Sequence, residues 1–161
     1  MAEIAPVEVT MKIPVPAAEL FGYLTDAGKY VQWMGSEATL DPSPGGVYRI
    51  RMPDGFEAAG QFLTVEHPRQ VVFTWGFADE DAAQRTKRER AEPVSVNPMP
   101  AGSTRVTVTL TDQDGRTLLT LRHEDLPSAE LRDGHDVAWN TYLPRLVTRA
   151  TGGDPGPDPH S

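Results

Sequence analysis

Apolar and polar residues alternate from the beginning of the chain. Within residues 7–13 every second position is apolar: Val7, Val9, Met11 and Ile13. A period of two residues over this length predicts a half-buried strand. Pro16 comes next, and proline suits the first turn of a helix because no helical hydrogen bond needs its missing N–H. We therefore expect a short helix after Pro16, followed by a second short helix at about 26–34.

Residues 36–124 predict a series of strands joined by turns. The dipeptide Asp54-Gly55 is one of the strongest hairpin signals, because a tight turn that matches the strand twist requires positive φ angles. The patterns on either side of it predict strands at about 47–52, 56–66, 71–77, 104–111 and 117–124. Consecutive strands that are joined by hairpins pair antiparallel, so we expect an antiparallel meander.

The last patterned segment predicts a long helix that begins after Ser128, a good N-cap residue. Its apolar stripe recurs at spacings of three and four: Leu131, His135, Ala138/Trp139, Tyr142 and Leu146. This helix is the only predicted element large enough to cover one face of the sheet. The pattern therefore predicts an α+β fold: a curved antiparallel β-sheet of about six to seven strands wrapped on a long C-terminal α-helix, with two short helices after strand 1.

The chain has the length of one domain. Its 161 residues fall within the rough range of about 100–200 residues per domain, and we expect a single domain at 1–150. Residues 78–101 interrupt the strand pattern and predict a long, mobile loop. We interpret that loop as a solvated insertion, a lid or a partner-binding loop. Residues 151–161 are rich in Pro and Gly, and we expect a disordered tail there.

Composition counts against several classes of function. Fifteen basic and 23 acidic residues give a net charge of −8, which argues against binding to nucleic acid and to anionic membranes. The chain has no cysteine, which removes disulfides, thiolate metal sites and cysteine nucleophiles. It has no Gly-x-Ser-x-Gly elbow and no phosphate-binding loop. Since no apolar run approaches a membrane span and the start does not resemble a signal peptide, we expect a cytoplasmic protein.

Short motifs in a fixed order resemble the START-like, or SRPBCC, superfamily. The run Val15–Asp26 is similar to the first helix of that superfamily. Further motifs narrow the resemblance to the subfamily named after the C-terminal domain of the activator of the ninety-kilodalton heat-shock chaperone ATPase: Gln32-Trp33-Met34, Asp41–Tyr48, Asp54-Gly55, Gly60-Gln61-Phe62, Val72–Trp75, Ser103–Val108, Leu121–Pro127, Gly134-His135, Trp139, Tyr142-Leu143 and Arg145-Leu146. The resemblance covers about residues 5–148.

The resemblance implies a helix-grip fold, also called START-like or birch-allergen-like. Members of the superfamily bind lipids, sterols, polyketides and plant metabolites in a cavity between the sheet and the long helix, and some are ring-closing enzymes. We therefore expect a small-molecule-binding protein that holds an apolar or aromatic ligand and needs no cofactor. The alternatives are a cyclase or dehydratase that uses the same cavity, and a protein that binds a chaperone or regulator in a bacterial stress response. A homodimer is a further alternative that the sequence leaves open. A chaperone partner is the least expected, because the eukaryotic activator carries a further N-terminal domain.

Such a cavity predicts which side chains would contact a ligand. The candidates face inward by their strand parity or by the helix stripe: Trp33, Tyr48, Ile50, Met52, Phe62, Phe73, Trp75, His123, Trp139 and Tyr142. Aromatic residues with polar tips suit a pocket that is mostly apolar and orients its ligand through a few hydrogen bonds. The alternative is that these residues simply fill the core.

His123 is the candidate for acid–base chemistry. Its parity places it with Leu119 and Leu121, so it faces the long helix. There it would transfer protons together with Tyr48 or Tyr142, or it would only tie the last strand to the helix. His135 lies on the facing stripe, so the two histidines are positioned to approach each other. A metal site made of His123, Glu124, Asp125 and His135 fits no established spacing, and we expect no metal.

Overall fold

The computed structural model describes residues 4–78 and 98–159. Most of the predicted loop at 78–101 lies outside these described residues. The helices and strands occur in this order: β1 (Val7–Ile13), α1 (Ala17–Thr25), α2 (Ala27–Tyr30), β2 (Glu37–Leu40), β3 (Val47–Arg51), β4 (Glu57–Glu66), β5 (Gln70–Trp75), β6 (Thr104–Gln113), β7 (Arg116–Glu124) and α4 (Ala129–Ala150).

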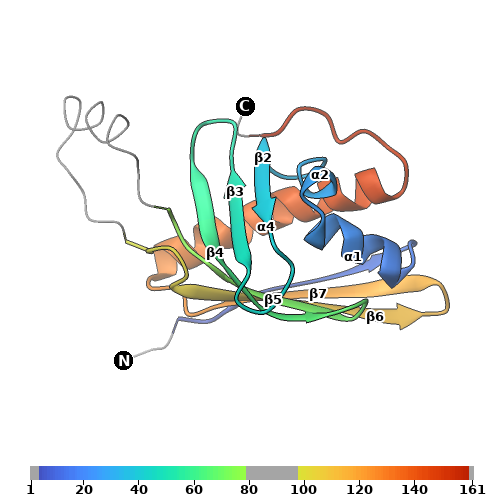
Figure 1. Cartoon of the computed structure of the whole chain (residues 1–161), viewed down its shortest axis with the longest axis horizontal. Helices are drawn as coiled ribbons and strands as arrows, with labels where there is room; N and C mark the ends of the chain where they lie inside the picture. Colours follow the sequence, from blue (N-terminus) through green and yellow to red (C-terminus); the bar gives the residue numbers. More distant parts are fainter. Residues whose placement is uncertain (1–3, 79–97, 160–161) are drawn as a thin grey trace.

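The strands form one seven-stranded sheet in the order β1-β7-β6-β5-β4-β3-β2. Every neighbouring pair is antiparallel. The first strand lies beside the last one, and Val9 pairs with Leu121. From β4 onward the sheet bends, so that β2, β3 and β4 stand at an angle to β6 and β7 (Figure 1). The predicted antiparallel sheet of six to seven strands is confirmed.

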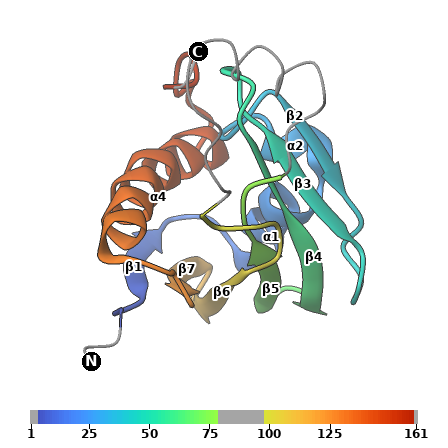
Figure 2. The same cartoon turned by 90° about the vertical axis from the view of Figure 1, so that its left-hand side faces the viewer.

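Helix α4 covers the concave side of this sheet. In Figure 2 it lies opposite β3 and β4, with β1, β7 and β6 beneath it. Its buried side is the predicted stripe, extended toward the helix end: His135, Trp139, Tyr142, Leu143, Leu146 and Ala150. The space between α4 and the sheet, which we call the interior, contains most of the buried apolar side chains. The predicted helix-grip arrangement is confirmed.

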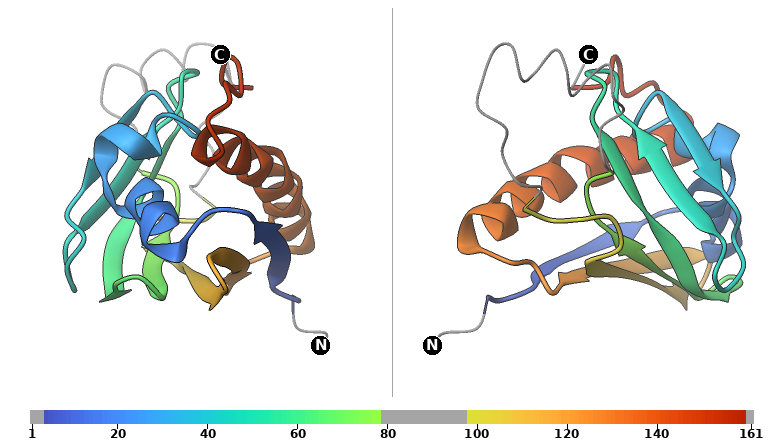
Figure 3. Two further views of the ribbon diagram at one scale, coloured as in Figure 1. Left: turned by 90° about the vertical axis from the view of Figure 1, so that its right-hand side faces the viewer. Right: turned by 60° about the vertical axis from the view of Figure 1, so that its left-hand side comes forward.

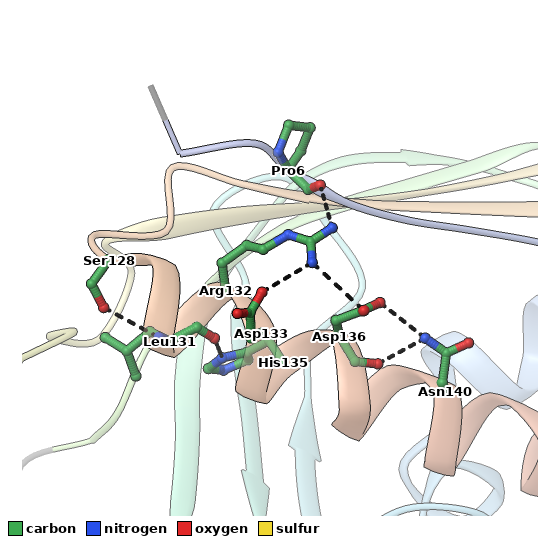
Figure 4. A network of polar contacts seen from close by, with 8 residues as sticks. All are labelled: Pro6, Ser128, Leu131, Arg132, Asp133, His135, Asp136 and Asn140. Atoms are coloured by element: carbon green, nitrogen blue, oxygen red, sulfur yellow. Dashed lines mark hydrogen bonds and ion pairs between the residues drawn. The ribbon is translucent and has the colours of Figure 1, made fainter. Parts of the chain in front are cut away.

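The beginning of α4 is fixed by hydrogen bonds to its own backbone and to the start of the chain. Ser128 caps the helix by accepting a 3.2 Å hydrogen bond from the N–H of Leu131. Arg132 donates to the carbonyl oxygen of Pro6 over 3.4 Å and pairs with Asp133 and Asp136 on its own helix (Figure 4). The helix is therefore connected to the residues just before β1.

Helices α1 and α2 lie between α4 and β2, at one side of the interior (Figure 3). The predicted second helix at 26–34 is too long, because α2 ends at Tyr30. Beyond it, the N–H groups of Gln32 and Trp33 bond three residues back, to Lys29 and Tyr30. This tighter winding makes turns, and Gly35 then takes a φ of +82°, which favours glycine.

Residues 151–159, the described part of the segment after α4, contain no helix or strand, as the composition predicts, but they have defined contacts. The guanidinium of Arg145 donates to the carbonyl oxygens of Pro155, Gly156 and Pro157 over 3.0–3.1 Å. Asp158 hydrogen bonds back to the domain. Residues 151–159 thus have contacts in the segment where the composition predicts a disordered tail at 151–161, because carbonyl groups accept hydrogen bonds even where Pro and Gly prevent a helix.

Candidate functional site

The structure brings all the predicted ligand-contacting residues into the interior. None of their side chains is more than 7% exposed: Trp33, Tyr48, Ile50, Met52, Phe62, Phe73, Trp75, His123, Trp139 and Tyr142. They come from the turn after α2, from four strands and the residue after β3, and from α4. Alternation along β3 and β5 turns every second residue inward, which is why strand parity identified most of them.

Five of the aromatic members form a continuous cluster of rings: Tyr48, Phe62, Phe73, Trp75 and Trp139. At its centre the rings of Tyr48 and Phe73 stack with centroids 4.1 Å apart. The Trp75 ring lies 5.9 Å from Tyr48 and 5.4 Å from Trp139. Phe62 meets Tyr48 edge to face at 5.7 Å. The cluster therefore joins the middle of the sheet to α4 through aromatic contacts.

Two tyrosine hydroxyls meet at the edge of this cluster. The hydroxyl of Tyr30 donates to the sulfur of Met34 over 3.7 Å, so in its hydrogen bond with Tyr48 it is the acceptor. Burial raises the pKa of both tyrosines well above its ordinary value. Both hydroxyls are therefore neutral at physiological pH and act as hydrogen-bond donors, not as bases. The sequence marks Tyr30 as a residue available for burial, but it was not among the predicted ligand-contacting residues, because a four-residue helix shows no period.

His123 has a partner at each ring nitrogen. The indole N–H of Trp139 donates to Nδ1 over 3.1 Å. Nε2 lies 2.8 Å from the hydroxyl of Thr104, and that hydroxyl lies 2.7 Å from the carbonyl oxygen of Trp75, to which it donates. The threonine proton is thus committed to the carbonyl, so Nε2 is the donor. These contacts define a neutral His123 protonated at Nε2.

His135 continues the same chain of hydrogen bonds with the opposite tautomer. The indole N–H of Trp75 donates to Nε2 over 3.2 Å. Nδ1 lies 2.8 Å from the carbonyl oxygen of Leu131, which can only accept. The His123 and His135 rings lie 5.1 Å apart and nearly perpendicular, as their positions on β7 and α4 predicted. We call the chain formed by Trp139, His123, Thr104, Trp75 and His135 the indole–imidazole chain.

Burial makes both histidines weak bases. Burial, and after it the nearby His135, together lower the pKa of His123 to about 3. Burial also lowers the pKa of His135, although the hydrogen bond to Leu131 opposes this shift. At neutral pH both rings are uncharged and both nitrogens of each ring are occupied. Proton transfer by His123 would therefore require its bonds to Trp139 or Thr104 to break first.

Tyr142 and Met52 lie away from this chain, at the end of the interior next to the segment after α4. The Tyr142 hydroxyl is 2.6 Å from Oδ1 of Asp158 and 3.9 Å from the sulfur of Met52. Burial, then the hydrogen bond to Asp158, raises the pKa of Tyr142. Tyr142 thus serves a different part of the interior from His123. Asp158 gave no signal in the sequence, because nothing in a tail composition marks one carboxylate.

The outer face of β2, β3 and β4 carries a small charged groove of about 140 Å³, lined by Glu37, Thr39, Arg49, Arg51 and Glu57. Arg49 pairs with Glu57 at 2.7 Å, whereas Arg51 lies 3.9 Å from both Glu37 and Glu57. The two arginine side chains are about half exposed. Exposed pairs of this kind contribute little to stability, and the groove balances its own charges.

Within residues 4–78 and 98–159, no group of three or more His, Asp or Glu side chains is arranged to hold a metal ion. Over the same residues, no helix is both long enough and apolar enough to cross a membrane.

A seven-stranded antiparallel sheet gripping one long C-terminal helix places the protein in the helix-grip class of START-like, or SRPBCC, proteins. Within that class the chain belongs to the family of Activator of Hsp90 ATPase homolog 1-like proteins, whose sequence model matches residues 14–150. The resemblance found in the sequence motifs is thereby confirmed. No curated protein sequence is similar enough to count as a match.

Three solved structures illustrate the range of this similarity. An AHSA1-like protein from Rhizobium etli is 34% identical, with 98% of this chain and 92% of that chain covered and a TM-score of 0.64. DynU16, a protein in the dynemicin biosynthetic locus, is 22% identical with a TM-score of 0.72, and 95% of this chain matches 50% of that one. An Hsp90 activator from Plasmodium falciparum is 21% identical, with 92% of this chain and 96% of that chain covered and a TM-score of 0.66. The last two similarities establish the fold alone.

Proposed function

We propose that this protein binds a small apolar or aromatic molecule in the interior between the sheet and α4. The observation that carries the proposal is the ring cluster around Tyr48 and Phe73, built from strands and helix together. Aromatic walls of this kind are typical of small-molecule sites, which are mostly apolar with a few polar groups. The biosynthetic setting of DynU16 and the ligand cavities of START-like proteins support the same proposal.

The polarity of the interior favours an apolar ligand over a polar one. The indole N–H groups of Trp75 and Trp139 already donate to His135 and His123. A ligand that lies against these rings therefore meets aromatic faces and no unpaired donor. Burying a polar group without a partner costs free energy, so a ligand rich in hydroxyls would be disfavoured there. An apolar or aromatic ring carries no such penalty.

Two measurements test this function. Native mass spectrometry of the freshly purified protein, with solvent extraction, reveals any molecule that copurifies. Titration with neutral 2-naphthamide, followed by quenching of tryptophan fluorescence, measures binding directly, and we expect saturable one-to-one quenching.

A matched pair of variants locates the binding. Phe73→Leu removes the ring stacked on Tyr48, and we expect its affinity for 2-naphthamide to fall by about fivefold or more. Val72→Leu changes the neighbouring residue, which β5 turns to the opposite face of the sheet, and it should bind like the unaltered protein. Equal affinities for all three proteins, or no binding by any, would contradict the proposal.

A further inference from the structure

The segment after α4 places a carboxylate on a pair of hydrogen-bond donors. Asp158 accepts from the Tyr142 hydroxyl through Oδ1, at 2.6 Å, and from the N–H of Gly35 through Oδ2, at 2.9 Å. Each donor engages a different oxygen of the same group. Donors that grip both oxygens in this way are a specific means of recognising a carboxylate.

The two donors are positioned by the domain itself. Tyr142 belongs to α4 and is 1% exposed. Gly35 is held by its neighbours, since a Cβ atom there would come within 2.7 Å of the Ile50 side chain and 2.9 Å of the Arg51 carbonyl oxygen. Its positive φ of +82° directs the N–H. Preorganised donors of this kind do not need the segment after α4 in order to form.

Arg145 supplies a positive charge one turn along α4 from Tyr142. Its Nε donates to the carbonyl oxygen of Trp33 over 3.0 Å, which anchors the side chain to the domain. Its remaining nitrogens donate to carbonyl oxygens of residues 155–157. Displacement of that segment would leave the guanidinium anchored by Trp33 and its other N–H groups directed toward the place that the segment had occupied.

We propose that Tyr142, Gly35 and Arg145 form a binding site for the carboxylate of an aromatic or apolar acid, and that Asp158 occupies this site as an internal competitor. This inference rests on the proposed function, because the apolar part of the acid would lie in the interior beside Met52, whose sulfur contacts the Tyr142 hydroxyl at 3.9 Å. The acid would bind as the segment from 151 to 159 leaves its place, which runs from the end of α4 to the start of β2 (Figure 1).

Charge makes the site selective. The chain has a net charge of −8, and the carboxylate of Asp54 lies near enough to Tyr142 to raise its pKa. An incoming acid is therefore repelled over most of the molecule, and it gains binding energy only where directed donors and the Arg145 charge meet it. A neutral amide of the same shape offers these donors one carbonyl oxygen and no charge, so it would gain less from them.

Isothermal titration calorimetry with two ring compounds of equal shape tests the site. The probes are 2-naphthoate, which carries the carboxylate, and neutral 2-naphthamide. Asp158→Ala removes the competitor, and we expect it to raise the affinity for 2-naphthoate about tenfold or more, and the affinity for 2-naphthamide by much less. Asp154→Ala is the matched control. Its carboxylate lies on the same segment, but it bonds to Gly156 N–H and pairs with Arg149, so neither affinity should change.

A second variant and a peptide distinguish two explanations of a gain in affinity: binding of the carboxylate by Tyr142, and easier access to the interior after Asp158 is removed. Adding Tyr142→Phe to the Asp158→Ala protein should abolish the gain for 2-naphthoate. A synthetic peptide of residues 151–161 should compete with 2-naphthoate for the Asp158→Ala protein, and the same peptide with Asp158→Ala should not. An equal gain for both ring compounds, or no gain, overturns this inference while naphthamide binding still supports the proposed function. Binding of neither compound to any variant overturns both.

Discussion

Trp139 donates its indole N–H to Nδ1 of His123 over 3.1 Å, and this hydrogen bond joins α4 to β7 inside the apolar interior. Because Nε2 of the same imidazole bonds to Thr104 on β6, one side chain connects the helix with two adjacent strands. The histidine that the sequence offered as an acid–base group is therefore also a structural link. The two roles predict different consequences when it is changed.

Replacing His123 by alanine should destabilise the fold strongly. The change leaves the Trp139 N–H buried without its acceptor, removes the donor to Thr104, and opens space in the core. Together these losses should lower the free energy of unfolding by about 3 kcal/mol. Urea denaturation measures the change. Trp139→Phe, which removes only the indole N–H and part of the ring, should cost less, and a larger cost for that variant would contradict this account.

Stability should fall as the pH drops below about 6.5. His123 has a pKa of about 3 when folded, against an ordinary 6.5, so between these values the unfolded chain binds the proton and the folded one does not. Unfolding is then favoured by acid, and lowering the pH from 7 to 5 should cost about 2 kcal/mol from this residue alone. The lowered pKa of His135 acts in the same direction.

Urea midpoints at pH 7 and pH 5 measure this effect, and the His123→Gln variant is the comparison. Glu124 contributes little to the change in stability between pH 7 and pH 5. Its ordinary pKa of 4.5 lies below this interval, and the hydrogen bond with Arg105 lowers its pKa further in the folded protein. The variant should lose the contribution of His123, about 2 kcal/mol between these pH values, and keep that of His135. An unchanged slope would show that His123 is solvated or charged in the folded protein.

The sequence predicted that His123 faces the interior, but it did not predict the hydrogen bonds of Thr104. Strand parity fixes which face a residue occupies, so His123, Tyr48 and Phe73 could all be placed inside. Parity says nothing about which polar atoms will meet across strands. Thr104 also begins β6 beside the residues expected to form a loop, so its hydroxyl could not be assigned to Trp75 without the sheet register.

The buried tyrosine pair should behave non-additively. Tyr30→Phe leaves the Tyr48 hydroxyl buried without its acceptor, and we expect a loss of about 1–2 kcal/mol. The double variant with Tyr48→Phe removes both hydroxyls together and should cost less than the sum of the two single changes. A double-mutant cycle by urea denaturation gives the coupling. Simple additivity would mean that the two hydroxyls do not depend on each other.

Two glycines should respond to alanine in opposite directions. Gly60 lies against β5, where a Cβ atom would collide with the carbonyl oxygen of Thr74, so Gly60→Ala should lower stability by several kcal/mol or prevent folding. Gly134 lies inside α4 with no atom within 4 Å of a new Cβ. Gly134→Ala should stabilise the protein by about 0.5–1 kcal/mol. Thermal melts of both variants provide the comparison.

In the segment after α4, composition predicts the secondary structure but not the contacts. Pro and Gly content correctly excluded a helix there, but contacts depend on individual groups. Arg145 gave no hint that it would bind carbonyl oxygens of residues 155–157, because an arginine on a helix face is equally suited to solvent. The meeting of Asp158 with Gly35 joins residues 123 positions apart, which no local pattern can reveal.

Because the first strand pairs with the last, the β-sheet cannot form completely until late in translation. Glu8 on β1 bonds to Arg122 on β7, 114 positions later. While the ribosome is still making the intervening strands, β1 has no partner, and an unpaired strand edge invites association with other chains. The sheet closes only after β7 emerges, and α4 emerges after β7 to cover it. For most of its translation the nascent chain therefore depends on its surroundings to keep β1 from pairing elsewhere.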